Sequence, residues 1–423
     1  MSTSDSASAS SPRLHRNVWV TSATSFLTDV SSEMILNVLP LFLANVLGVR
    51  IWAVGVVEGL GDAVASLVKL YSGWLADRLR ARKWLAVAGY GVSAASKPFY
   101  LIASTWVHVA AIRGGDRVGK GIRTAPRDAL LADSTTPARR GLAFGLHRAA
   151  DTGGAVVGLL VTIWVVGRVQ GGGARLADET FRTLVLWSLL PAGLAVVVLA
   201  VGARDVVRRG QARGAPRVRL RGLGRPFAWF VGCSALFELG NSADAFLVLR
   251  AQERGLAVVD LLWVLVAYNA VYALVATPAG SLSDRIGRRA VVIAAWGLYA
   301  VCYAGFAAAE GSGQIVGLYL LYGVYQGMAA GAAKALVADL VPDHLVALAY
   351  GGYAAAVGIV TLPASIVAGV LWEGFGSWTG WGPSAPFVFG AATALLASGL
   401  FFVTVRPPGP AASPAAGPAD LDP

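Results

Sequence analysis

Long apolar blocks recur along almost the whole chain and dominate its pattern. Each block is roughly 20 to 30 residues long, enough to cross a hydrocarbon core of about 30 Å as an α-helix. A helix satisfies its own backbone groups, which a membrane interior requires. The pattern therefore predicts an all-α integral membrane protein with twelve transmembrane helices, at residues 18–47, 52–76, 84–104, 106–132, 142–166, 182–202, 227–250, 258–281, 289–309, 314–339, 348–371 and 387–405.

Composition agrees with this prediction and excludes one class of partner. Of 423 residues, 56% are hydrophobic and 14% are charged, whereas soluble proteins carry about 25% charged residues. The net charge of +11 would suggest a nucleic-acid partner in a soluble protein. Here the basic residues lie in short loops between apolar blocks, as the positive-inside rule describes. We expect a lipid bilayer around a monomer, and no nucleic acid.

The segment between the sixth and seventh spans sets the predicted orientation. It contains eight arginines against the single acid Asp205, so we expect it in the cytoplasm of a cell (inner or plasma) membrane. Six spans on either side then leave both termini cytoplasmic. The end segments are rich in Ser or in Pro and Ala and are expected to be disordered. The predicted organisation is a tail at 1–16, a six-helix bundle at 17–203, a linker at 204–226, a second bundle at 227–405 and a tail at 406–423.

Two internal matches divide the chain into homologous halves. GWLADRLRARK is repeated as GSLSDRIGRR 207 residues later, and ADSTTPARRGLAFG as ADLVPDHLVALAYG 206 residues later. The first match pairs Gly73, Leu75, Asp77 and Arg78 with Gly280, Leu282, Asp284 and Arg285.

With this repeat the chain resembles the major facilitator superfamily, whose Gly-x-Leu-x-Asp-Arg-x-Gly-Arg-Arg loop follows helix 2 and is echoed after helix 8. The second copy fits completely, with Gly287 and Arg288 in place; the first copy has Arg80 and Ala81 instead. The resemblance covers residues 17–405 and implies a transporter that works by alternating access, with helices 1, 4, 7 and 10 lining a central cavity. It implies a gating role for Gly73, Asp77, Arg78, Gly280, Asp284, Arg285, Gly287 and Arg288.

Two shorter patterns refine the resemblance. Arg117 and Gly121 fit the Arg-x-x-x-Gly of helix 4. The antiporter pattern of helix 5 keeps its glycines at Gly145, Gly154 and Gly158 but lacks the proline, which weakens that signal. FLTDVSSEMI, DRVGKGIRTAPRDALLADS and FGLHRAADTGG look like a bacterial and archaeal subgroup with a highly charged helix 4.

That helix carries a stripe of charges within about 120° of arc. Each would cost about 3 kcal/mol against lipid, so the stripe must face protein or water. Its members are Arg113, Asp116, Arg117, Lys120, Arg123 and Arg127. Polar residues of neighbouring spans can meet it, namely Asp29, Glu33, Glu58, Asp62, Lys69, Lys97, His147, Arg148 and Asp151. Because the two signs nearly balance, an ion-pair network that merely holds the bundle together explains these charges as well as a functional one does.

Candidate proton sites follow from the repeat. Aligning Phe26 with Phe237 places Glu33 opposite Asp244 on helices 1 and 7. A carboxylate in a low-dielectric cavity has its charged form disfavoured, while a nearby arginine acts in the opposite sense, so such a group can take up and release protons. The proton-coupling candidates are Asp29, Glu33, Asp244 and Asp151. A proton gradient would supply the energy, with no cofactor.

The second half is rich in tyrosine, whose ring and hydroxyl suit an amphipathic organic solute, although core packing or interfacial anchoring would use the same residues. The candidates for the substrate cavity are Asn241, Tyr319, Tyr322, Gln326 and Lys334. The spacing of Gly323, Gly327 and Gly331 favours close helix packing over a ligand contact.

No histidine or cysteine spacing indicates a metal site, and no nucleotide loop or nucleophile elbow suggests an enzyme. We therefore expect a secondary transporter of a small organic solute, coupled to protons, with efflux favoured. The alternatives are uptake of an anionic solute through Arg117, Lys120 and Arg123, and a receptor or scaffold built on the same fold.

Overall fold

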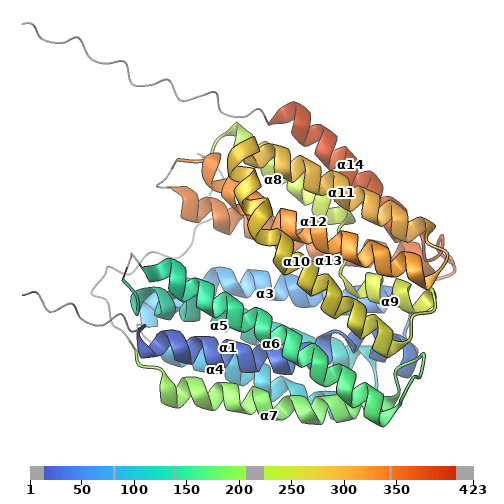
Figure 1. Cartoon of the computed structure of the whole chain (residues 1–423), viewed down its shortest axis with the longest axis horizontal. Coiled ribbons are helices and arrows are strands. Elements are labelled where there is room, and N and C mark those ends of the chain that lie inside the picture. Colours follow the sequence, from blue (N-terminus) through green and yellow to red (C-terminus); the bar gives the residue numbers. More distant parts are fainter. Residues whose placement is uncertain (1–13, 80–81, 137–138, 206–222, 343–344, 406–423) are drawn as a thin grey trace, which may run out of the picture.

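The structure is a computed structural model that describes residues 14–79, 82–136, 139–205, 223–342 and 345–405. In this part of the chain every regular element is a helix, and each predicted span coincides with one helix or with consecutive ones (Figure 1). Nine of these segments are long and apolar enough to cross a membrane. The other three spans are two interrupted helices and the charged helix 4, whose side chains lower its hydropathy.

The elements follow one another in chain order with short connections. The first half holds α1 (Arg16–Leu36), α2 (Leu39–Leu41), η1 (Phe42–Val46), α3 (Ile51–Leu79), α4 (Arg82–Ser96), η2 (Lys97–Ile102), α5 (Trp106–Asp133), α6 (Arg140–Val169) and α7 (Asp178–Gly202). The second half holds α8 (Arg225–Gly240), α9 (Ala245–Glu253), α10 (Val258–Ile286), α11 (Arg288–Ala308), α12 (Ser312–Asp339), α13 (Val346–Glu373) and α14 (Ala385–Thr404).

Three spans predicted as continuous helices are interrupted, which corrects the predictions 18–47, 84–104 and 227–250. Pro40 is the second residue of the short α2, which runs on into the π-helical turn η1. Pro98 lies at the start of the 3-10 helix η2. Proline lacks the N–H that a continuing α-helix would use, so the helix changes at these points. The third interruption has no proline: α8 ends at Gly240, and Asn241–Ala243 are not helical before α9 begins.

The repeat seen in the sequence is confirmed in the helix bounds and in the packing. The bounds of α3 and α10 are displaced by 207 residues, and those of α5 and α12 by 206. Gly121 lies so close to Val68 that an added Cβ would come within 2.6 Å of it, and Gly327 is equally close to Val275, at 2.8 Å. Close packing also occurs at Gly323, whereas the space at Gly331 is open.

The helices form two bundles, α1–α7 and α8–α14 (Figure 1). We call the end at which α7 ends and α8 begins the linker side, and the opposite end the far side. Within the first bundle α5 packs on α3 and α4, and within the second α12 packs on α10 and α11. The bundles meet where α3 packs on α13 and α6 packs on α10. These two seams are equivalents under the repeat.

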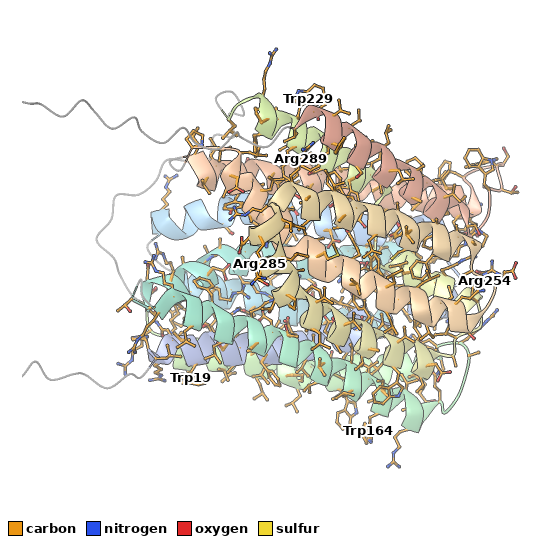
Figure 2. The ribbon with its side chains drawn as sticks, turned by 45° about the horizontal axis from the view of Figure 1, so that its top comes forward. Trp19, Trp164, Trp229, Arg254, Arg285 and Arg289 are labelled. Carbon is orange, nitrogen blue, oxygen red and sulfur yellow. The ribbon has the colours of Figure 1, made fainter. Side chains whose placement is uncertain are left out.

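The outer surface of the bundles is apolar, as a lipid-facing surface requires. Exposed side chains include Leu190, Val201 and Leu274. Trp19 near the start of α1 and Trp229 near the start of α8 are exposed toward the linker side, and Trp164 toward the far side (Figure 2). Tryptophan favours the level of lipid headgroups, so these rings mark the two edges of the membrane-spanning region.

Candidate functional site

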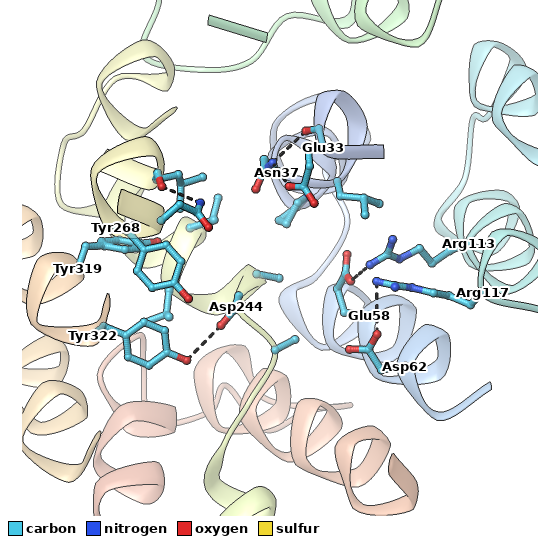
Figure 3. A pocket seen from close by; sticks show the side chains of 18 residues that line it. Glu33, Asn37, Glu58, Asp62, Arg113, Arg117, Asp244, Tyr268, Tyr319 and Tyr322 are labelled. Carbon is cyan, nitrogen blue, oxygen red and sulfur yellow. Dashed lines mark hydrogen bonds and ion pairs between the residues drawn. The ribbon is translucent and has the colours of Figure 1, made fainter. Parts of the chain in front are cut away.

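A cavity of about 320 Å³ lies between the two bundles, in the far-side half of their helices. One wall comes from α1, α3 and α5, and the other from α10, α12 and the segment that joins α8 to α9 (Figure 3). Its polar lining residues are Glu33, Asn37, Glu58, Asp62, Arg113, Arg117, Asp244, Tyr268, Asn269, Tyr319 and Tyr322.

Ion pairs between α3 and α5 form the first wall. Arg113 Nη2 donates to Glu58 Oε2 at 2.6 Å, with both side chains less than a tenth exposed. One turn further along, Arg117 Nη2 lies 3.3 Å from Asp62 Oδ1, whose side chain is 43% exposed. The helices approach closely here because Gly61 leaves room, and its added Cβ would lie 3.2 Å from both arginine side chains. Arg117 is thus paired with Asp62 of α3, and neither Glu33 nor Asp29 of α1 forms an ion pair with it in the described residues.

Tyrosine rings form the second wall. Tyr268 and Tyr322 stack with their centroids 5.8 Å apart and an interplanar angle of 19°, and Tyr319 meets Tyr268 edge-on at 6.4 Å. The Tyr322 hydroxyl donates to Asp244 Oδ1 at 3.2 Å. Figure 3 shows these rings on one side of the cavity and Arg113 on the opposite side.

Of the four proton-coupling candidates, Glu33 and Asp244 line the cavity. Glu33 accepts a hydrogen bond of 2.8 Å from the Asn37 amide. Within the described residues neither carboxylate forms an ion pair. Asp29 and Asp151 lie outside the lining, where Asp29 has Arg123, Lys120 and also Glu33 as charged neighbours.

The charged residues of α5 contact different neighbouring helices. Asp116 accepts a hydrogen bond from Ser93 of α4, on the side away from the cavity. The Arg123 guanidinium lies over the Tyr90 ring of α4, 4.4 Å from its centroid. Arg127 pairs with Asp128 at 2.8 Å, while Lys120 is exposed. An arc of 120° is wide enough to touch both neighbouring helices.

The remaining predicted network residues lie outside the cavity. Lys97 donates to Ser31 of α1, His147 lies 3.6 Å from Asp151, and Lys69 is exposed. Arg148 donates across the second seam to the Tyr272 hydroxyl of α10 at 3.0 Å. The contacts of Lys97 and Arg148 join different helices, whereas that of His147 lies within α6.

Of the five substrate-cavity candidates, Tyr319 and Tyr322 line the cavity. Asn241 instead donates to Glu238 at 2.9 Å, Gln326 lies 3.5 Å from the Tyr322 hydroxyl but outside the lining, and Lys334 is exposed nearer the linker side. Helical periodicity gives the face of a residue but not its depth in the bundle.

Sequence reasoning missed three polar lining residues, Asn37, Tyr268 and Asn269. The repeat could have found Asn269, because it follows Asp62 by the same 207 residues that separate α3 from α10. It likewise places Tyr319 opposite Arg113, 206 residues apart. The two walls are therefore equivalent positions that carry different chemistry.

A tight seam closes the far side above the cavity. A Cβ at Gly55 of α3 would come 2.2 Å from the Ser365 backbone oxygen of α13, and one at Gly369 would come 2.5 Å from Trp52. At the end of this seam Glu373 accepts from the Ile51 backbone N–H and pairs with Arg50 at 3.8 Å.

On the linker side the repeated loops are held by a matching pair of contacts, which we call the clasps. Arg82 pairs with Asp133, and Arg288 pairs with Asp339, the repeat equivalent of Asp133. The repeat equivalent of Arg82 is the next residue, Arg289. Each clasp joins the start of one helix to the end of another within the same bundle.

The gating motif adjoins the second clasp. Asp284 lies 3.8 Å from Arg288, and Gly287 has a φ of +94°, which favours glycine. Gly280, Arg285 and Arg78 are at the ends of α10 and α3. The surroundings of Gly73 and the side chain of Asp77 lie outside the described part of the structure.

The glycines of the weakened antiporter pattern have a packing role. A Cβ at Gly154 would come 2.4 Å from the Phe26 backbone oxygen, and one at Gly158 would come 2.7 Å from that of Val30. They let α6 approach α1, whereas the space at Gly145 is open.

Two repeated helical bundles, apolar outside and enclosing a charged cavity between them, define a membrane transporter. A sequence model of the Major Facilitator Superfamily matches residues 21–262 and 228–422. The chain belongs to this superfamily. An uncharacterized MFS-type transporter of Methanocaldococcus jannaschii is 31% identical to it, over 93% of this chain and 95% of that one.

Solved structures share the fold at low sequence identity. The nucleoside transporter NupG is similar with a TM-score of 0.75 and 14% identity, over 92% of this chain and 99% of that one. A D-xylose-proton symporter is similar with a TM-score of 0.68 and 14% identity, over 93% and 98%. At this identity the likeness shows the fold alone.

Proposed function

We propose that this chain is a secondary active transporter that exports a small organic solute across the cell membrane in exchange for protons. In this proposal the linker side faces the cytoplasm, as the arginines between the bundles favour. The bundles rock about the cavity, which opens alternately to the two sides.

The observation that carries the proposal is the pair Glu33 and Asp244, one from each bundle, in a single cavity. Each accepts a hydrogen bond from a neutral donor, the Asn37 amide and the Tyr322 hydroxyl. A desolvated carboxylate without a cation partner is costly, so it gains from binding either a proton or a cationic group. Two such groups at the contact between moving bundles can couple proton binding to the motion.

The far-side seam supports alternating access. It holds α3 against α13 above the cavity and ends in Arg50 and Glu373, whose side chains are 44% and 38% exposed. An exposed pair of this kind contributes about 0 to 1 kcal/mol, so this contact is inexpensive to break when the far side opens.

Uptake of an anionic solute is less favoured. Of the cations proposed for it, Arg117 is paired with Asp62, Arg123 lies over Tyr90 and Lys120 lies outside the lining. An incoming anion would have to compete with a carboxylate for Arg117.

The test is a screen of organic solutes in proteoliposomes that contain a pH-sensitive dye and carry an imposed pH gradient. We expect solute movement to drive proton movement, and Glu33→Gln or Asp244→Asn to reduce that proton flux about tenfold or more. Asp260→Asn, an equal charge change at an exposed far-side position, is the matched control. Solute flux without proton flux would refute coupling, and no flux of any solute would refute transport.

A further inference from the structure

The formal charges that line the cavity do not balance. The lining contains four carboxylates and two arginines. The carboxylates are Glu33, Glu58, Asp62 and Asp244, and the arginines are Arg113 and Arg117. On the first wall, Arg113 neutralises Glu58 and Arg117 neutralises Asp62. The excess therefore belongs to Glu33 and Asp244, and a bound solute meets it directly.

Charges just outside the lining do not offset this excess. Lys120 and Arg123 lie near Asp29 and Asp151, two cations with two carboxylates. Lys97 donates to Ser31 and Ser32, and its charged neighbours include Asp116, Asp29 and Glu33. The three cations Lys97, Lys120 and Arg123 are matched by the three carboxylates Asp29, Asp116 and Asp151, so the charges of Glu33 and Asp244 remain in excess.

The aromatic wall adjoins the unpaired charge. The Tyr322 hydroxyl is bonded to Asp244, and the Tyr322 ring stacks on Tyr268 (Figure 3). The face of an aromatic ring attracts a cation within about 6 Å, and more strongly where water is excluded. The same faces also stack on flat apolar rings. The wall can therefore attract both the positive charge and the flat ring of a single molecule.

We propose that the transported solute is an organic cation that carries a flat ring. Its ring lies against Tyr268 and Tyr322, and its ammonium group is held by Asp244 and Glu33. The volume of about 320 Å³ limits it to a small molecule of one to a few rings. This assignment rests on the proposed transport function and specifies the solute class of the same site.

The first test needs no mutation. Ethidium, a fluorescent ring-bearing cation, is titrated onto the purified full chain in detergent and then displaced by three small compounds. Benzyltrimethylammonium has both ring and charge, tetramethylammonium has the charge alone, and benzenesulfonate has a ring with the opposite charge. We expect the first to displace ethidium, the second to be about tenfold weaker, and the third to have no effect.

The second test assigns the walls. Asp244→Asn and Glu33→Gln should each weaken ethidium binding about tenfold, and Asp260→Asn should leave it unchanged. Tyr268→Leu should weaken it about fivefold, whereas Tyr268→Phe, which keeps the ring, should stay within about twofold. Each variant is compared only if it elutes as a single folded species.

Displacement by benzenesulfonate as readily as by benzyltrimethylammonium would overturn the proposal, as would failure of ethidium to bind. The proposed function fails separately. Proton-driven flux of an anion would refute the proposed solute class but support the proposed transport function. Ethidium binding without any proton or solute flux would support the solute class but refute the transport function.

Discussion

Replacing Arg113 with methionine should destabilise the protein far more than the same change at Arg117. Both arginines lie on α5 and pair with α3, four residues apart, so helix propensity and membrane position are closely matched. Methionine keeps the length and apolar stem of each side chain. The difference between the two variants therefore isolates the surroundings of the charges.

Solvent exposure decides the magnitude. The side chains of Arg113 and Glu58 are 4% and 8% exposed, and their atoms are 2.6 Å apart. At an effective dielectric constant of about 20 this attraction is about 6 kcal/mol. For Arg117 and Asp62, at 3.3 Å and with Asp62 43% exposed, screening by water lowers it toward about 1 kcal/mol.

Removing one member of a buried pair leaves the other charge uncompensated, at about 3 to 5 kcal/mol. Removing Arg117 leaves behind Asp62, whose side chain is 43% exposed and can be hydrated, so this loss should cost only about 0 to 1 kcal/mol. We expect Arg113→Met to lower the thermal unfolding midpoint in detergent several times more than Arg117→Met. The double variant Arg113→Met with Glu58→Leu should recover much of the loss, because no buried charge remains.

The reasoning would be refuted if Arg117→Met lowered the midpoint as much as Arg113→Met, or if the double variant were no more stable than Arg113→Met. The first result would show that water does not reach Asp62. The second would show that the arginine stabilises the bundle by packing rather than by pairing.

Two further predictions concern the linker side and the orientation. The second clasp lies within one bundle, so Arg288→Ala and Asp339→Ala should each lower the free energy of unfolding by about 1 kcal/mol. The double variant should lose little more, which a thermal double-mutant cycle would measure. Full additivity of the two losses would show that the residues do not interact. In intact cells a cysteine at Glu310, on the far side, should react with an impermeant maleimide, and one at Arg225 should not. Labelling of Arg225 from outside would reverse the proposed orientation.

The sequence predicted the helices well because the signal for a span is long and repeated. Every span has a helical counterpart, with ends a few residues from the prediction. The interruptions at Pro40 and Pro98 had a local signal in the prolines themselves. The break after Gly240 had no proline to signal it, and Gly240 itself is in close contact with Thr393 and Gly390 of α14.

The site was predicted in its residues more than in its contacts. Periodicity placed Arg113 and Arg117 on one face of their helix and Tyr319 and Tyr322 on one face of theirs. All four residues line the cavity. It could not say that Arg117 pairs with α3 rather than with α1, because the rotation of neighbouring helices is set by packing. Periodicity also does not give the depth of a residue along its helix, which is why Lys334 was grouped with residues of the cavity.

The division of the cavity between the bundles has an evolutionary consequence. The ion pairs belong to one half of an ancient duplication and the tyrosines to the other, so the two walls can change independently. A substitution at Tyr319 would alter the shape of the cavity without disturbing the pair of Arg113 and Glu58. A lineage built in this way can shift its solute preference stepwise while its buried charges stay in place.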